Sequence, residues 1–295
     1  MATETRDDAE LLGIEMSKKT ADRLKAVGFH AFTWTTIALV LTPVAWMAIV
    51  SLNSISFLNF IEDPMRWVDG VSLDAYDRAI NETDFPIWFK NSAIVTLAST
   101  ALSIVVCTFG AYSIGRLEFR GRKAVATFLL LTQMFPLILV AVPLFLIFRD
   151  LGLVNTLYGL TIAYVAFVLP FSVWMLRGFY ENLPASLEEA AMVDGSTRIG
   201  AVIRVVVPLS APAIATTAIF AWIFAWNEFV MALILISDSG KTTLPPGLST
   251  WVGRYSLQWD LLMAGALGAT LPLFIILFFL QKYLINGLAE GAVKT

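Results

Sequence analysis

The chain has 295 residues, of which 58% are hydrophobic and 15% are charged, and its formal net charge is −3. Soluble domains carry charge on about a quarter of their residues, and several apolar runs here exceed the roughly 18 residues that cross a membrane. This composition excludes a soluble globular protein and predicts an integral membrane protein. Because the runs are continuous rather than alternating, we expect helices and not barrel strands.

Six apolar runs are long enough to cross the membrane, so the sequence predicts an all-α protein with six transmembrane helices. Their expected bounds are 31–52, 89–114, 124–148, 159–176, 205–236 and 262–284. We divide the chain into an N-terminal arm at 1–28, a first span with an external segment at 29–88, and a core transmembrane domain at 89–295. The arm has mixed charge, which favours a short amphipathic or disordered segment, and no cleavable signal peptide is expected.

The Lys and Arg residues are unevenly distributed between the two sides of these spans. Of the 20 basic residues, 14 fall in the N-terminal arm, in the links after the second and fourth spans, and at the C-terminal end. The remaining six lie on the other side. Because basic loops stay in the cytoplasm, we expect both termini to be cytoplasmic.

The external segment between the first two spans carries several aromatic residues, among them Trp67, Tyr76, Phe85 and Trp88. Aromatic side chains gather at membrane interfaces. An interfacial belt is therefore favoured over a substrate site in this segment.

Polar and helix-breaking residues interrupt the later spans. Gln133 is a buried polar candidate in the third span, and six prolines fall within the spans or at their ends: Pro136, Pro143, Pro170, Pro208, Pro212 and Pro272. Proline kinks a helix and frees backbone groups. A kinked bundle suits alternating access, although kinks also occur in static bundles.

The link at 182–204 between the fourth and fifth spans is the most polar segment of the core. Pro184 suits a first helical turn, and Ser186 with Glu189 matches a capping box. A helix is therefore expected over 187–193. Gly195 after Asp194 would end it, and Ser196 would cap the next helix. The predicted helix-turn-helix lies along the membrane face, either as a partner-docking surface or as a simple solvated face.

This link resembles the EAA loop of bacterial ABC-importer permeases. The pattern is carried by Glu189-Ala190-Ala191, by Asp194-Gly195 at the family's spacing, and by Pro208. The chain departs from it where Val202, Val205 and Val207 replace the usual Phe, Ile and Leu, which keeps those positions apolar. The segments 226–229 (WNEF) and 287–294 (GLAEGAVK) resemble motifs of the carbohydrate-uptake permeases, in particular the MalG-like subunit of the maltose-type transporters. The resemblance covers about 88–294.

The resemblance implies an ABC type I importer permease fold with a cytoplasmic EAA coupling helix, in a bacterial or archaeal plasma (inner) membrane. The implied partners are a second, MalF-like permease, two ATP-binding cassette ATPase subunits and an external solute-binding protein that delivers the sugar, a di- or oligosaccharide of the maltose or trehalose type. Glu189 would pair with a cationic ATPase residue, and Gly195 would allow the turn. Ala190, Ala191, Asp194 and Pro208 complete the implied coupling set.

Glu228 and Asn227 fall inside the predicted fifth span. A charged group at the bilayer centre costs about 3 kcal/mol, so it should face a cavity, the bundle interior or a partner. With Gln133, these two residues form the candidate translocation path. Interhelical hydrogen bonding is the alternative role.

Two other functional classes fit these features less well. A gradient-driven secondary transporter would use Glu228 as a proton or sodium site, but it has no need of an EAA loop. A membrane enzyme or scaffold is disfavoured, because the sequence has no catalytic cluster: it has no Walker-type phosphate loop, nucleophile elbow or metal-ligand spacing. We therefore expect a non-enzymatic subunit without cofactor or metal, and no binding of nucleic acid. Cys107 is expected to be a buried small side chain, and His30 an interfacial one.

Overall fold

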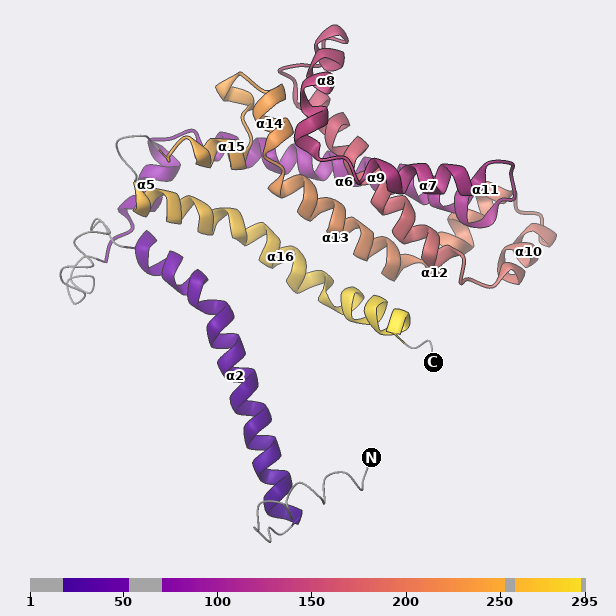
Figure 1. The fold of residues 1–295 in the computed structure, drawn as a ribbon, viewed down its shortest axis with the longest axis horizontal. Helices are drawn as coiled ribbons and strands as arrows, with labels where there is room; N and C mark the ends of the chain where they lie inside the picture. The colour runs from indigo at the N-terminus through magenta and orange to yellow at the C-terminus, as the bar shows by residue number, and fades with distance from the viewer. Residues whose placement is uncertain (1–17, 53–70, 253–257, 293–295) are drawn as a thin grey trace.

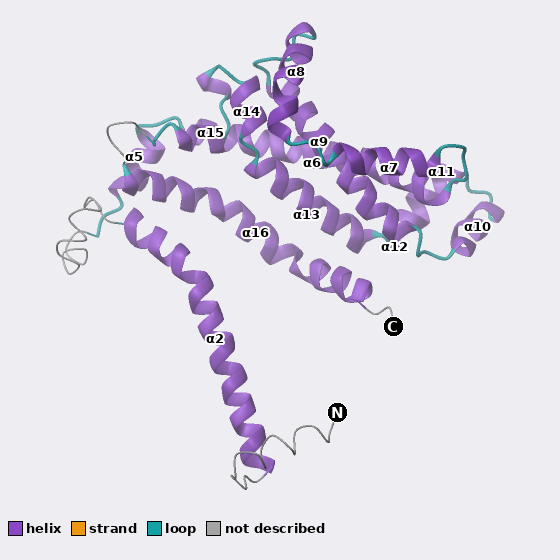
Figure 2. Cartoon of the chain, viewed as in Figure 1, coloured by secondary structure: helices purple, strands orange, loops and turns teal. Residues whose placement is uncertain are grey.

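A computed structural model describes residues 18–52, 71–252 and 258–292, and the elements within these ranges are helices (Figure 1, Figure 2). Short 3-10 and π segments, η2 (Ser239–Lys241) and η1 (Val202–Val206), join them. The α-helices are α2 (Lys18–Ser51), α5 (Asp74–Asn81), α6 (Phe85–Arg116), α7 (Arg122–Thr132), α8 (Leu137–Asp150), α9 (Leu157–Tyr180), α10 (Ala185–Val193), α11 (Arg198–Ala201), α12 (Val207–Leu209), α13 (Ala211–Asn227), α14 (Val230–Leu235), α15 (Leu244–Ser249) and α16 (Trp259–Ala292).

Four of these helices are long and apolar enough to cross a membrane as single elements: most of α2, α6, α9 and the first part of α16. Two bent pairs of helices also pass this test, so the described residues contain up to six spans if each bent pair counts as one span. The expected bounds of the second and fourth spans differ from those of α6 and α9 by only a few residues.

The third and fifth spans are not the straight helices that the sequence analysis expected. Between α7 and α8 the axis turns by 102°, and Pro136 lies in the break. The second bend, of 81°, falls at Ser210, before α13 with Pro212 in its first turn. The expected fifth span to residue 236 is wrong at its end, because α13 stops at Asn227 and Glu228 is extended. Proline removes a backbone donor in each case, so the helix is free to change direction there.

Helix α6 is the centre of the bundle, with its most extensive contacts to α9 and then to α13. Its buried face includes small hydroxyl residues, among them Thr96, Ser99 and Ser103. Small side chains let two helix backbones approach closely. In a membrane the lipid tails are as apolar as the side chains, so helices associate mainly through the van der Waals contacts that this approach provides. This face of α6 is therefore suited to close packing in the bundle, while large apolar side chains such as Leu97 and Val105 are exposed on the helix's other side.

An aromatic cluster closes the bundle near the start of α6. Trp222 and Trp226 stack with ring centroids 5.0 Å apart, and Trp88 packs in the same cluster. The Trp226 indole N–H donates to the Ala269 carbonyl of α16 at 3.0 Å, which satisfies its one polar group. Trp88 is buried at 6% exposure, so the expected interfacial position is wrong for this residue. Trp67 lies outside the described residues.

Helix α2 stands apart from the rest. It runs away from the bundle and meets it through α16 (Figure 1). None of the residues in its most apolar window is buried, and large side chains such as Phe32 and Leu39 are about three-quarters exposed, at 73% each. In a membrane this surface faces lipid or another chain.

Candidate functional site

The EAA segment forms the helix α10, which lies with α11 at one end of the bundle (Figure 1). The helix begins at Ala185, two residues before the expected start, and Pro184 is its N-cap with no side-chain hydrogen bond. The predicted capping box of Ser186 and Glu189 is therefore wrong. Proline fixes its own φ near −60° and prepares the chain to enter the helix without a polar cap.

The turn after α10 agrees with the prediction. Gly195 has φ +90°, and its N–H donates to the Met192 carbonyl at 3.1 Å while the Ser196 N–H donates to Ala191 at 3.0 Å. These two bonds are the pattern of a Schellman motif, which glycine in the left-handed region favours. Thr197, and not Ser196, caps α11 by accepting from the Gly200 N–H at 3.1 Å.

The two adjacent glutamates of α10 have different surroundings. Glu189 is exposed, as are Ala190 and Asp194, whereas Ala191 is half-buried. Glu188 is buried, and it accepts a hydrogen bond from the Tyr112 hydroxyl at 2.8 Å. Arg116, the last residue of α6, forms an ion pair with it at 2.9 Å. The EAA signature thus presents its own glutamate outward, and sequence reasoning did not single out the residue before it.

A second charged cluster lies at the same end of the bundle. Glu181 pairs with Arg122 and with Arg177, both at 2.9 Å. Arg122 also donates to the Gly115 carbonyl at 2.8 Å, so it satisfies a free acceptor at the end of α6. These contacts tie the start of α7 to the last turns of α6 and α9.

Pro208 does not belong to the exposed loop. It lies in α12, on the return into the bundle, after the π-helical segment η1. The Ser210 hydroxyl donates to the Val206 carbonyl at 2.7 Å just before the 81° bend. Single π turns are frequent at functional sites, and here one connects the EAA loop to α13.

Glu228 lies at a break between helices and not in the middle of a span. Its carboxylate accepts from the backbone N–H groups of Met231 at 2.9 Å and Ala232 at 3.2 Å. The Tyr164 hydroxyl of α9 donates to its carbonyl at 3.4 Å. A carboxylate that accepts from the first free N–H groups of a helix is a helix cap. Glu228 therefore holds the start of α14 against the bundle.

The other two candidate path residues, Asn227 and Gln133, are exposed, and their side chains bond to other groups than Glu228 does. The Asn227 side chain donates to the Ile223 carbonyl of its own helix at 2.8 Å. The Gln133 side chain, at the break between α7 and α8, donates to the Phe167 carbonyl of α9 at 3.1 Å. Each residue is held by a different backbone group, so these contacts do not gather the three into one polar site.

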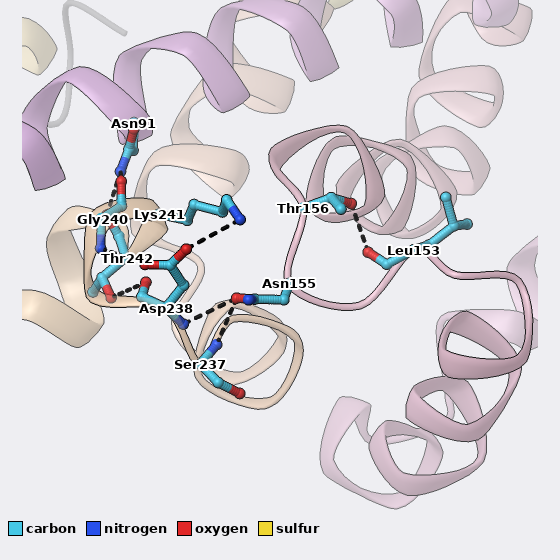
Figure 3. Close-up of polar contacts among 9 residues, drawn as sticks. All are labelled: Asn91, Leu153, Asn155, Thr156, Ser237, Asp238, Gly240, Lys241 and Thr242. Carbon is cyan, nitrogen blue, oxygen red and sulfur yellow. Dashed lines mark hydrogen bonds and ion pairs between the residues drawn. The ribbon is translucent and has the colours of Figure 1, made fainter.

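A polar network at the opposite end of α6 was not anticipated from the sequence. Asn155, with φ 61°, accepts from the N–H groups of Ser237 at 3.2 Å and Asp238 at 2.9 Å (Figure 3). Asn91 of α6 donates to the carbonyls of Gly240 and Thr242, both at 3.0 Å. The sequence offered only a weak signal for the turn at Asn155. Asparagine is more frequent than most residues in the left-handed region, but its presence does not require that conformation.

The charged residues of this network, Asp238 and Lys241, pair with each other within the same loop. A hydrogen bond from Lys241, with a further one from the Gly240 N–H, holds the pKa of Asp238 below its usual value. Among the described residues, no group of three or more His, Cys, Asp or Glu side chains is arranged to hold a metal ion. The network therefore fixes the conformation of the 237–242 loop between α6 and the α8–α9 turn.

Residues 107–290 match the family described as binding-protein-dependent transport system inner membrane component. The chain belongs to this family. It is a multi-pass inner-membrane permease of an ABC importer that works with a binding protein, and it is not the ATPase. This confirms the resemblance read from the EAA loop, whose residues lie inside the matched region.

Curated relatives cover most of the chain. The trehalose/maltose transport system permease MalG of Thermococcus litoralis is 36% identical over 264 residues, which are 87% of this chain and 92% of the relative. The trehalose permease SugB of Mycobacterium tuberculosis is 34% identical over 88% of this chain and 94% of its own length. The sulfoquinovosyl glycerol permease SmoH of Agrobacterium fabrum is 35% identical over 86% and 89%.

The fold is that of solved importer permeases. A chain of a bacterial ABC transporter that imports the acidic polysaccharide alginate superposes with a TM-score of 0.76 at 22% identity, covering 92% of this chain and 99% of that one. This confirms the expected ABC importer permease fold, and at this identity it shows the fold alone. The C-terminal motif begins within the described part of α16 and ends beyond it.

Proposed function

We propose that this chain is the MalG-like permease subunit of an ATP-driven importer for a di- or oligosaccharide of the maltose or trehalose type. The observation that carries the proposal is the α10–α11 loop, which holds Glu189 exposed on a helix closed by Gly195. The relatives are named as permeases for trehalose and maltose, for trehalose and for sulfoquinovosyl glycerol. These names support a carbohydrate as the cargo.

Energy enters at the end of the bundle that carries α10. Two ATPase subunits bind there, and Glu189 pairs with a cationic residue of one of them, while Ala190, Ala191 and Asp194 fit the walls of its cleft. ATP binding draws the ATPases together and carries α10 with them. The loop passes this movement through η1 and the Pro208 segment into α13, whose bend at Ser210 lets the halves of the span rotate against each other.

The path for the sugar lies between this chain and a second, MalF-like permease. Gln133, beside the break between α7 and α8, and Asn227, the last residue of α13, are exposed amides, and they line the path. Glu228 shapes its wall by capping α14. The external binding protein releases the sugar at the α14–α15 end, and the bundle end with α10 faces the cytoplasm together with both termini.

The gradient-driven carrier is less well supported. A proton or sodium site needs a carboxylate that is free to exchange its ligand, and both carboxylate oxygens of Glu228 accept backbone N–H groups. The EAA loop would also have no function in such a carrier.

The test is gentle purification of the chain from its native membrane, with identification of the proteins that accompany it. A second permease and an ATPase in stoichiometric amounts are expected. Reconstitution with the binding protein then measures ATP hydrolysis with maltose, trehalose and lactose. Lactose is the control sugar, and stimulation by neither maltose nor trehalose would contradict the proposed cargo. A stable chain that purifies alone would contradict the importer role.

A further inference from the structure

The neighbouring acids Glu188 and Glu189 of α10 lie on different faces of the coupling helix. Successive residues of an α-helix are separated by about 100°, so two neighbours do not share one face. Glu189 is exposed, whereas the Glu188 side chain is only 10% exposed. The two carboxylates therefore have different partners, and the proposed ATPase contact at Glu189 leaves Glu188 without a role.

Glu188 contacts the last turns of α6. Its carboxylate accepts from the Tyr112 hydroxyl at 2.8 Å and pairs with Arg116 at 2.9 Å. The Arg116 side chain is 14% exposed, so both charges are largely removed from water. Burying a charge is costly unless it is paired. The ion pair and the Tyr112 hydrogen bond therefore favour one position of α10 relative to α6.

The place of this contact in the fold gives it mechanical importance. Helix α6 has the most extensive contacts of the bundle, with α9 and α13. The other contacts of α10 are chiefly with α11 and η1, the segments that follow it in the chain. Without the Glu188 contact, movement of α10 would reach the bundle mainly along the chain. With it, the movement also reaches the central helix directly.

We propose that Glu188 is a positioning residue that, with Arg116 and Tyr112, latches the coupling helix to α6. The two glutamates then divide the work: Glu189 engages the ATPase and Glu188 transmits its movement to the bundle. This inference rests on the proposed coupling function of α10. Removing one partner of a largely buried pair shifts the equilibrium toward undocked α10 by roughly tenfold or more.

The test measures the position of α10 relative to α6 in the full chain, in lipid nanodiscs. Cys107 is replaced by Ser, and nitroxide labels are attached at Val193→Cys and Phe109→Cys, whose native side chains are exposed. Pulsed electron paramagnetic resonance gives the distribution of distances between the labels. We expect a narrow distribution in the parent, a broad one in Glu188→Gln and Arg116→Glu, and a narrow one again in the charge-swapped Arg116→Glu/Glu188→Arg protein.

Three further variants distinguish loss of the Glu188 contact from non-specific disruption of the structure. Glu181→Gln removes the charge shared by Arg122 and Arg177 at the same end of the bundle, and it should leave the distribution narrow. Tyr112→Phe removes only one hydroxyl and serves as a milder test if Glu188→Gln does not fold. Glu189→Ala should leave the distribution narrow while it weakens ATPase binding.

An unchanged distribution in both Glu188→Gln and Tyr112→Phe, or a swapped protein as broad as the single variants, would overturn the latch. Co-purification of the ATPase with unlabelled Glu188→Gln is expected, because Glu189 is intact. If no ATPase accompanies even the parent, the proposed function fails. The distance measurement needs no ATPase, so it still decides the role of Glu188.

Discussion

Glu189 is the single side chain on which the proposed contact with the ATPase depends. It is exposed on α10 and makes no side-chain hydrogen bond or ion pair with another described residue, so Glu189→Ala should leave folding intact. Truncating one partner of an ion pair that becomes buried in an interface costs about 2–5 kcal/mol. We expect ATPase binding to weaken tenfold or more, measured by titration of purified ATPase onto the immobilised permease.

The matched control is Glu181→Ala, which removes another glutamate at the same end of the bundle. It lies outside α10 and pairs with Arg122 and Arg177 of its own chain. ATPase binding should stay within about threefold of the parent, since surface ion pairs contribute little. Equal losses in both variants would mean that Glu189 has no specific contact.

Gly195 tests the shape of the loop rather than its charge. At φ +90° a side chain is strained, although an added Cβ would meet no atom within 4 Å. The cost of Gly195→Ala is therefore conformational, about 1–2 kcal/mol, and the turn should relax away from its native form. ATPase binding should fall several-fold, and less so in Gly195→Asn, because asparagine tolerates the left-handed region. The same loss in both variants would exclude the backbone as the cause.

At the scale of the element, Glu228 decides whether α14 keeps its place. Glutamine in its position retains one carbonyl acceptor but replaces the other with an amide donor, which faces a backbone N–H. We expect Glu228→Gln to destabilise the protein by about 1 kcal/mol and to lower its apparent Tm by a few degrees, while sugar uptake is retained in part. Complete loss of uptake at an unchanged Tm would instead place Glu228 in the transport step. Asn227→Ala, which removes an amide bonded only within α13, is the control for stability.

The helices themselves were largely predictable, because a long apolar run in lipid has few alternatives to a helix. The bounds of α6 and α9 and the glycine turn at Gly195 follow from local rules. The bends do not, since proline permits a change of direction and the tertiary contacts set its angle. One such contact is the hydrogen bond from Gln133 to Phe167.

The contacts that were missed join residues far apart in the sequence. Tyr112 and Glu188 are separated by 76 residues, and Asn155 and Ser237 by 82. The pattern of residues within a short stretch of sequence gives no information about such distant pairs. The role of Glu188 was missed for this reason, although its place beside the motif was visible. The capping role of Glu228 was missed for a related reason. It depends on α13 ending at Asn227, directly before Glu228, and the apolar run of the sequence does not mark that end.

At the scale of the whole molecule, the two ends of α6 carry different polar structures. Asn91 and the 237–242 loop lie at one end, and Arg116 with α10 lies at the other. The 25 residue-to-residue steps from Asn91 to Arg116 span about 37 Å of helix, enough to cross the hydrocarbon core. These two structures therefore face opposite aqueous compartments. The excess of Lys and Arg in the links at the α10 end predicts that this end is cytoplasmic.

This orientation predicts which surfaces a membrane-impermeant maleimide reaches. Glu118, in the link after α6, and Ser239, in the opposite loop, are both exposed, whereas the native Cys107 is fully buried. In right-side-out vesicles Ser239→Cys should be labelled and Glu118→Cys should not, and inverted vesicles should reverse the pattern. The reversed result would put α10 outside the cell, where no ATP is available, and the coupling role of Glu189 would then be untenable. Labelling at both sites in one preparation would indicate leaky vesicles, so the two positions act as controls for each other. Retention of an entrapped dye measures the leak independently.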